Sequence, residues 1–182
     1  MTDALSSEEQ VALLALARSE IEETLRGRRA GRKPATPLPQ IKAGAFVSLH
    51  KHGQLRGCIG TFDTSRPVVE QVRQMAVAAA TRDSRFAPMT DAELDAVDIE
   101  ISVLTPPRRI SDPGEINVGE HGLVISRGWK RGVLLPQVAT EYGWDRETFL
   151  QHTCLKAGLP EDAWTEPETE IQVFSAQVFG EK

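Results

Sequence analysis

Apolar residues recur at helical spacing along three stretches of the chain. Ser6 and Glu9 have the spacing of a capping box, and the apolar stripe behind them predicts a helix that ends near Gly27. Two further longer helices are predicted over residues 67–82 and 145–157. Shorter helices are predicted after Thr90 and over residues 137–142.

Alternation of apolar and polar positions predicts the strands. They cover residues 46–49, 55–62, 97–103, 122–126, 133–135 and 171–179. The first two strands form a hairpin, and the fourth and fifth form a second one. Because helices and strands mix without strict βαβ alternation, the fold class is predicted to be α+β, with mixed or antiparallel sheets and flanking helices.

The most informative segment is Leu-Arg-Gly-Cys-Ile-Gly at residues 55–60. Successive strand side chains point to opposite faces, so Leu55 and Ile59 are expected to share the face that packs on the core. The opposite face is expected to carry Arg56, Cys58 and Gly60. A cation therefore lies beside a thiol, between glycines that let a ligand or another backbone approach.

Composition narrows the functional class. The net charge of −5 disfavours broad binding to nucleic acid, whose affinity depends on neutralising phosphates. No apolar run approaches the roughly 18 residues that would span a bilayer, and charged residues within the first twenty argue against a secretory signal. With only two cysteines and no disulfide framework, we expect reduced thiols and a cytoplasmic protein.

Residues 26–40 are predicted to form an exposed connector. They combine a basic run at residues 26–33 with three prolines and show no periodicity. A solvated loop is favoured over an anion or nucleic-acid site, because no aromatic residues interleave the charges.

Cys58 is the candidate nucleophile. Nearby cations favour the reactive thiolate, and Arg56 is two residues away. His121 is the candidate base, and Asp83 or Glu100 would orient it if the fold brings them together. The alternative interpretation is that Cys58 packs as a small hydrophobe, which is common for cysteine.

A small anionic molecule is the preferred ligand class. Arg82 and Arg85 bracket Asp83, and such a pair of arginines can hold a carboxylate or phosphate. The candidate ligand-binding residues are Arg56, Gly57, Gly60, Thr61, Arg82, Asp83, Arg85 and Phe86. No histidine or cysteine spacing is typical of a zinc site, so neither a metal nor a cofactor is predicted.

Several blocks of the sequence, in order along the chain, resemble the AMMECR domain family. They are residues 44–49, 55–62, 82–88, 99–106, 121–123, 134–138, 143–145 and 153–158. Bacterial and archaeal members of this family carry the label AmmeMemoRadiSam system protein A. The resemblance implies one domain over residues 1–182, with a core at about 8–179, built as a compact unit of two interlocked subdomains.

The resemblance also implies a cleft near residues 55–60, and a shared pathway with Memo-like and radical S-adenosylmethionine proteins. The expected function is therefore binding of a small anionic metabolite in that cleft, within such a pathway. A thiol-dependent enzyme that uses Cys58 is the alternative, and a nucleic-acid-binding module is the third. Whether the protein is an enzyme stays open at this point.

Overall fold

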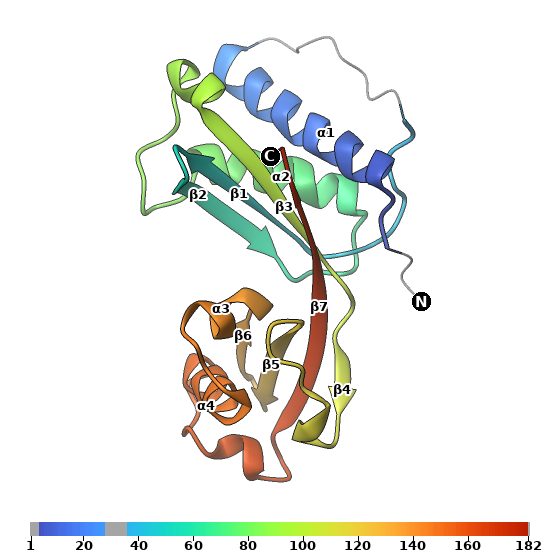
Figure 1. Ribbon diagram of the computed structural model, residues 1–182, viewed down its shortest axis with the longest axis vertical. Coiled ribbons are helices and arrows are strands. Elements are labelled where there is room, and N and C mark those ends of the chain that lie inside the picture. Colours follow the sequence, from blue (N-terminus) through green and yellow to red (C-terminus); the bar gives the residue numbers. More distant parts are fainter. Residues whose placement is uncertain (1–3, 28–35, 182) are drawn as a thin grey trace. The chain divides into compact units, whose positions relative to one another are not determined.

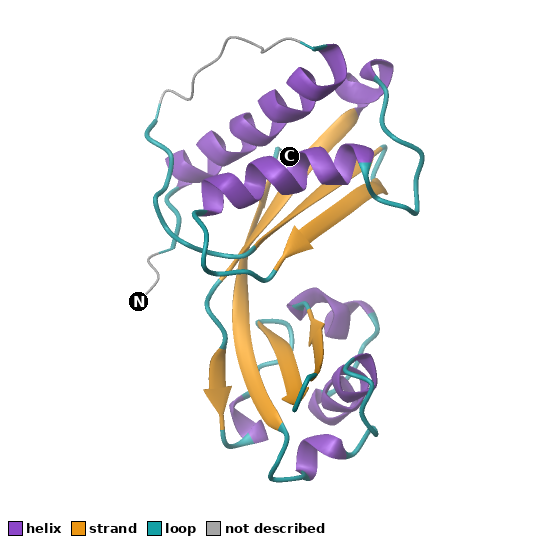
Figure 2. Ribbon diagram, turned by 180° about the vertical axis from the view of Figure 1, so that it is seen from behind, coloured by secondary structure: helices purple, strands orange, loops and turns teal. Residues whose placement is uncertain are grey.

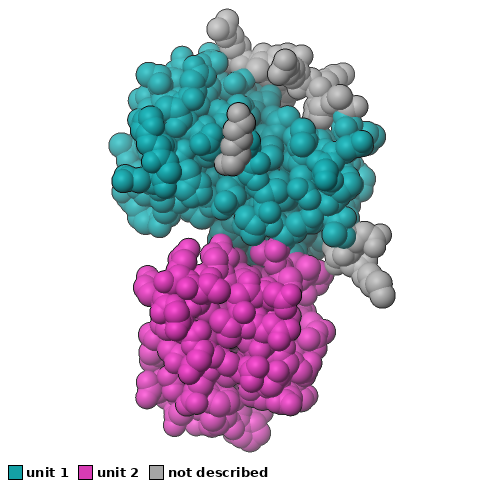
Figure 3. All heavy atoms as spheres, in the orientation of Figure 1, with its two compact units in different colours: residues 1–104, 177–182 teal, residues 105–176 magenta. Residues whose placement is uncertain are grey.

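The computed structural model describes residues 4–27 and 36–181, and the chain divides into two compact units. Unit 1 comprises residues 1–104 and 177–182, and unit 2 comprises residues 105–176 (Figure 3). The chain thus leaves unit 1 once and re-enters it through its last strand. The expectation of one domain over the whole chain stays a prediction, and most of the predicted basic run at 26–33 lies outside the described residues.

Unit 1 is built from helices and antiparallel strands in the order that the sequence predicted (Figure 1). Its elements are α1 (Ser7–Arg26), β1 (Ala45–Lys51), β2 (Gln54–Thr61), α2 (Val68–Thr81), a 3-10 helix (Asp91–Ala96), β3 (Val97–Leu104) and the end of β7 (Glu170–Gly180). The Ser6–Glu9 capping box is present at the start of α1. Strand β1 lies between β2 and β3 and is antiparallel to both.

Helices α1 and α2 cover one face of the β2-β1-β3 sheet (Figure 2). The core lies between them, because every second residue of β1 and β3 is buried against the helices. We call the other side the open face, since neither helix covers it. Its residues are Phe46, Ser48 and His50 of β1, Leu55, Cys58 and Gly60 of β2, and Asp98, Glu100 and Ser102 of β3.

The face predicted for Leu55 is wrong, because β2 contains a β-bulge. Gly57 pairs with Leu49, but the next pair along the hairpin is Leu55 with His50, so Arg56 is left without a cross-strand partner. Directly opposed residues share a face, so the bulge places Leu55 on the open face, where it is 40% exposed. Ile59 packs on the core as predicted, whereas Arg56 no longer follows the alternation that would align it with Cys58.

Two glycines of β2 are explained by close approach of other parts of unit 1. A Cβ on Gly57 would overlap the carbonyl oxygen of Ala79, so the absence of a side chain lets α2 lie against the strand. A Cβ on Gly60 would overlap the ring of Phe46 across the β1–β2 pair. Packing thus accounts for both glycines, and their predicted contact with a ligand stays a prediction.

Unit 2 has a second antiparallel sheet with its own core. Its elements are β4 (Arg108–Ile110), a 3-10 helix (Pro113–Glu115), β5 (His121–Arg127), β6 (Lys130–Leu134), α3 (Pro136–Glu141), α4 (Arg146–Lys156), a 3-10 helix (Ala163–Thr165) and most of β7. The strand order is β6-β5-β7-β4, and Phe149 and Leu150 of α4 pack on the sheet. The α+β class is confirmed. None of the helices in residues 4–27 and 36–181 is long and apolar enough to cross a membrane.

The close approach at Gly57 gives a testable prediction. Replacing Gly57→Ala sets a new methyl group against backbone, which cannot rotate away, and is expected to cost roughly 1–3 kcal/mol of unfolding free energy. Gly180→Ala, also in a strand of unit 1, is the matched control, because its new methyl group would meet its nearest neighbour, the carbonyl oxygen of Ile99, at an ordinary contact distance of 3.4 Å. Urea denaturation of both variants measures the difference, and equal losses would contradict the prediction.

Candidate functional site

A buried carboxylate fixes the edge of β2 at Cys58. The side chain of Asp83, which follows α2, is only 4% exposed. One carboxylate oxygen accepts the backbone N–H of Cys58 at 2.9 Å, and the other accepts the backbone N–H of Arg85 at 3.1 Å. The residues after α2 are thereby held along the outer edge of the strand, next to Cys58.

Arg85 forms an ion pair with the carboxylate of Asp83. Its guanidinium binds both carboxylate oxygens, with Nε at 3.0 Å from Oδ1 and Nη2 at 2.7 Å from Oδ2. The same Nη2 donates a longer bond, of 3.4 Å, to the carbonyl oxygen of Cys58. The hydrogen bonds from Arg85 hold the pKa of the Asp83 carboxyl well below its usual range.

Arg56 has a carboxylate partner of its own. Its Nε and Nη2 each lie 3.1 Å from an oxygen of Glu93, and Nη2 also donates to the carbonyl oxygen of Ala87 at 3.0 Å. Lys51 donates to the same carboxylate at 3.0 Å. The hydrogen bond from Arg56, aided by those from the backbone of Thr90 and from Lys51, lowers the pKa of Glu93 to about 2.

The ring of Phe86 contacts both arginines. The guanidinium carbons of Arg56 and Arg85 are 5.9 Å and 5.5 Å from its centroid, within the range of cation–π attraction. Five predicted residues therefore come together in unit 1. We call Arg56, Cys58, Asp83, Arg85 and Phe86 the Cys58 site.

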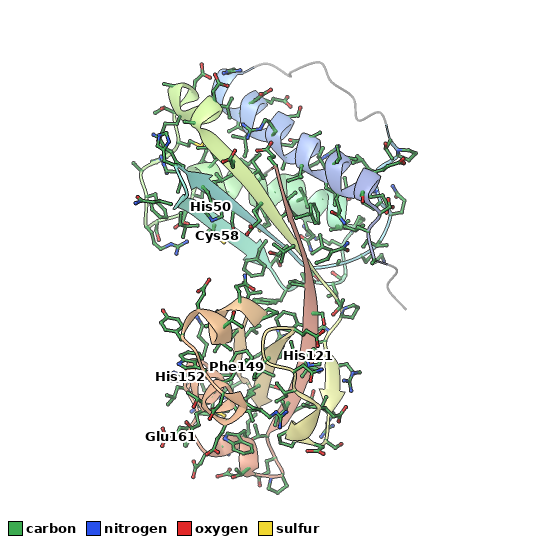
Figure 4. The ribbon with its side chains drawn as sticks, viewed as in Figure 1. His50, Cys58, His121, Phe149, His152 and Glu161 are labelled. Carbon is green, nitrogen blue, oxygen red and sulfur yellow. The ribbon has the colours of Figure 1, made fainter. Side chains whose placement is uncertain are left out.

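Cys58 itself is half-buried and lies on the open face, directly across from Ser48 of β1. The Ser48 hydroxyl donates a hydrogen bond to its sulfur at 3.1 Å. Figure 4 labels Cys58 and His50, which lie on these neighbouring strands. Cys154, the other cysteine, is fully buried in unit 2, where burial raises the pKa of its thiol. Both cysteines are free thiols.

Three other predicted residues are not part of this cluster. The hydroxyl oxygen of Thr61 accepts the backbone N–H of Asp63 at the end of β2. Arg82 caps the end of α2 and is exposed. His121 begins β5 in unit 2, where its Nδ1 accepts the backbone N–H of Asn117 at 3.1 Å. The roles assigned to these three residues stay predictions.

Two contributors were not expected at the site from the sequence. Glu93 forms a capping box with Thr90, whose backbone N–H it accepts, and the same carboxylate binds Arg56. Ser48 faces Cys58 because the register of the β1–β2 pair sets these two residues directly opposite each other. That register is a property of the two paired strands, so the sequence around Cys58 alone does not show it.

No group of histidines, cysteines and carboxylates that could hold a metal ion exists among residues 4–27 and 36–181. The structure does contain a hollow of about 500 Å³ in unit 2. It lies between β4 and the loop that leads into β7, with Arg109, Trp164 and Thr169 in its wall. The Cys58 site is therefore a surface cluster on the strand edge, to which unit 1 contributes every residue.

Comparison with known proteins shows the family and a solved structure of similar fold. The family model AMMECR1 matches residues 14–179. A protein from Methanothermobacter thermautotrophicus is 48% identical, over 97% of this chain and 96% of its own, and protein MK0488 from Methanopyrus kandleri is 46% identical, over 100% and 93%. The crystal structure of the uncharacterized protein PH0010 from Pyrococcus horikoshii has a TM-score of 0.84 and 41% identity, and covers 98% of this chain and 94% of that one.

The lowered pKa of Glu93 predicts an acid-dependent loss of stability. The folded-state pKa lies below the usual value of 4.5, so the stabilisation is complete above about pH 4.5 and is lost as the pH falls toward about 2. In Glu93→Gln, the melting temperature is expected to change less with pH over this window than it does in the wild type. Glu70→Gln, an exposed change on α2, is the control and should follow the wild-type curve. Parallel curves for Glu93→Gln and the wild type would show that Glu93 does not titrate in this way.

Proposed function

The chain belongs to the AMMECR1 family, and on that premise we propose that it binds a small anionic molecule at the Cys58 site. The observation that carries the proposal is the pair of guanidinium groups that contact the ring of Phe86. Each is oriented by a carboxylate, Glu93 for Arg56 and Asp83 for Arg85. A carboxylate or phosphate is the ligand that arginine binds most specifically.

The hydrogen bonds leave donors for such a ligand. Among the described residues, neither Arg56 nor Arg85 uses its Nη1 in a protein hydrogen bond. The side chain of Arg85 is 56% exposed, so an anion can reach it from solvent. Because Asp83 already fixes the guanidinium plane, little side-chain entropy is lost when a ligand binds.

Anion binding is tested on the full chain with two probes, inorganic phosphate and succinate, by calorimetry at low ionic strength. Arg85→Gln removes the exposed cation but keeps an amide donor for Asp83, and is expected to weaken binding about tenfold, as for loss of a charged hydrogen bond. Arg66→Gln is the control, because Arg66 is equally exposed, at 54%, and has only a distant partner at 4.0 Å.

Arg66→Gln should bind both probes as the wild type does. Equal weakening in both variants would indicate general attraction to positive charge and would contradict a site at Arg85. Thermal melts of each variant confirm that the fold is intact before binding is compared.

A second function has a specific observation in its favour: Cys58 acts as a nucleophile toward the bound molecule. The sulfur accepts a hydrogen bond from Ser48 and lies on the open face rather than in the core. A donor at this position stabilises a thiolate, which is the reactive form. Bulges are frequent beside active sites, and the bulge at Arg56 interrupts β2 two residues before Cys58.

Alkylation by iodoacetamide tests this second function. Cys58 is expected to react at pH 7 faster than free cysteine, while the buried Cys154 remains unmodified and serves as the internal control. Peptide mass spectrometry of the intact, folded chain gives both rates. Cys58 that reacts more slowly than free cysteine would rule out an activated thiol.

The family resemblance supports two further parts of the proposal. We propose that the protein acts in the cytoplasm, in keeping with its two free cysteines, and in a pathway with Memo-like and radical S-adenosylmethionine proteins. A nucleic-acid-binding role has less support, because the net charge of −5 opposes it.

A further inference from the structure

We propose that His50, and not His121, accepts the proton of the Cys58 thiol, and that Asp98 orients its imidazole. This inference rests on the second proposed function, in which Cys58 is a nucleophile. It adds the identity of the base and the carboxylate that assists it. All three residues belong to one sheet of unit 1.

The strand register places the three side chains on the same face. Cys58 is directly opposite Ser48, and His50 is two residues further along β1, so Cys58 and His50 are diagonal neighbours on the open face. On its other side, His50 is directly opposite Asp98 of β3. Figure 4 shows His50 and Cys58 on these adjacent strands.

The separations suit a nucleophile and its base. Diagonal neighbours in an antiparallel pair have Cα atoms about 7–8 Å apart, and a longer side chain such as histidine bridges that distance. Directly opposite residues have Cβ atoms about 4.5–5.5 Å apart, which is close enough for a carboxylate to bond an imidazole. Ser48, whose hydroxyl is 3.1 Å from the sulfur, is directly opposite Cys58 and two residues before His50 on the same face.

The imidazole is available for this role. Among the described residues, the His50 ring forms no hydrogen bond, whereas Nδ1 of His121 is already occupied by the backbone of Asn117. In structures without substrate, catalytic hydrogen bonds are often long or poorly aligned and tighten only when substrate binds. His50 is half-buried, so it can exchange its proton with solvent after the reaction.

The charged groups around this pair favour proton transfer from sulfur to nitrogen. Asp98 and Glu100 of β3 lie on the same face as His50 and stabilise an imidazolium. Arg85 is bonded to the Cys58 carbonyl at the strand edge and stabilises a thiolate, while Asp83 neutralises part of that charge. Lys51, the residue after His50, is bound to Glu93.

The chemical step balances without any other reactant. The proton leaves Sγ of Cys58 for the neutral imidazole of His50, and the thiolate then displaces a leaving group from an electrophilic carbon of the anionic substrate: the carbon–sulfur bond forms, the bond from carbon to the leaving group breaks with its electron pair, and the imidazolium protonates the leaving group. With iodoacetamide as the probe, a carbon–sulfur bond forms, the carbon–iodine bond breaks, iodide leaves, and the imidazolium returns its proton to water.

The chain provides a matched control for the test. His50→Gln removes the base, whereas His52→Gln changes a histidine two residues away in the hairpin turn, at a position with φ of 53°. The rate of Cys58 alkylation by iodoacetamide is measured between about pH 5 and 9, the range in which histidine and cysteine titrate. The full chain is used, and peptide mass spectrometry assigns the modified cysteine.

In the wild type and in His52→Gln, the alkylation rate is expected to level off near neutral pH. In His50→Gln it should still be rising at the highest pH, and at pH 7 it should be about tenfold lower, because an unassisted thiol is only a few per cent thiolate there. Asp98→Asn, which changes an exposed side chain, should give a smaller loss of the same kind.

Two results would overturn the proposal, and they differ in what they exclude. A His50→Gln profile that superimposes on the wild type removes His50 as the base but leaves an activated Cys58. A wild-type rate below that of free cysteine removes the thiol function, and this inference with it. Anion binding at Arg85 is measured separately and is unaffected by either result.

Discussion

The arrangement of the Cys58 site depends on the buried carboxylate of Asp83. A buried charge is costly unless it is paired and hydrogen-bonded, and Asp83 is satisfied by backbone N–H groups of Cys58 and Arg85 and by the Arg85 guanidinium. Because β2 is the edge strand of its sheet, the N–H of Cys58 would otherwise lack a strand partner. One side chain thus closes the strand edge and positions Arg85. Removing Asp83 would disturb both at once.

The β-bulge at Arg56 decides which residues reach the open face. The pairs from Ala45–Thr61 to Leu49–Gly57 are regular and place Cys58 on the open face. Continued without the bulge, that pairing would set Leu55 opposite Lys51, on the face that the helices cover. The extra residue turns Leu55 onto the open face instead. It also leaves Arg56 free of the strand alternation, so that its guanidinium can reach Glu93. The same local irregularity therefore separates the thiol from the arginine that the sequence places two residues away.

Most elements of the fold could be predicted from the sequence, because capping boxes and apolar periodicity are local signals. Strand β4 was missed, since three residues are too few to show alternation. The cluster of Arg56, Cys58 and the segment after α2 was anticipated from residue chemistry and family resemblance. The sequence could not show which faces Leu55 and Arg56 take or that Ser48 lies opposite Cys58, because these depend on strand register. It could not show the part played by Glu93 either, because the contact of Glu93 with Arg56 joins residues 37 positions apart.

The charges of the cluster link the two proposed functions. Lys51, Arg56 and Arg85 are cationic, and Asp83 and Glu93 are anionic, which leaves one net positive charge at the β2 edge, whereas Asp98 and Glu100 make the β3 side of the open face negative. That charge can balance a thiolate or a bound anion, but the two together would repel each other. A bound anion therefore favours the protonated thiol of Cys58. If the bound molecule is to react, a base must remove that proton while the anion is in place. A neutral base on the open face, on the side of Cys58 away from Asp83 and Arg85, accepts that proton. Such a base adds no negative charge where the anion binds.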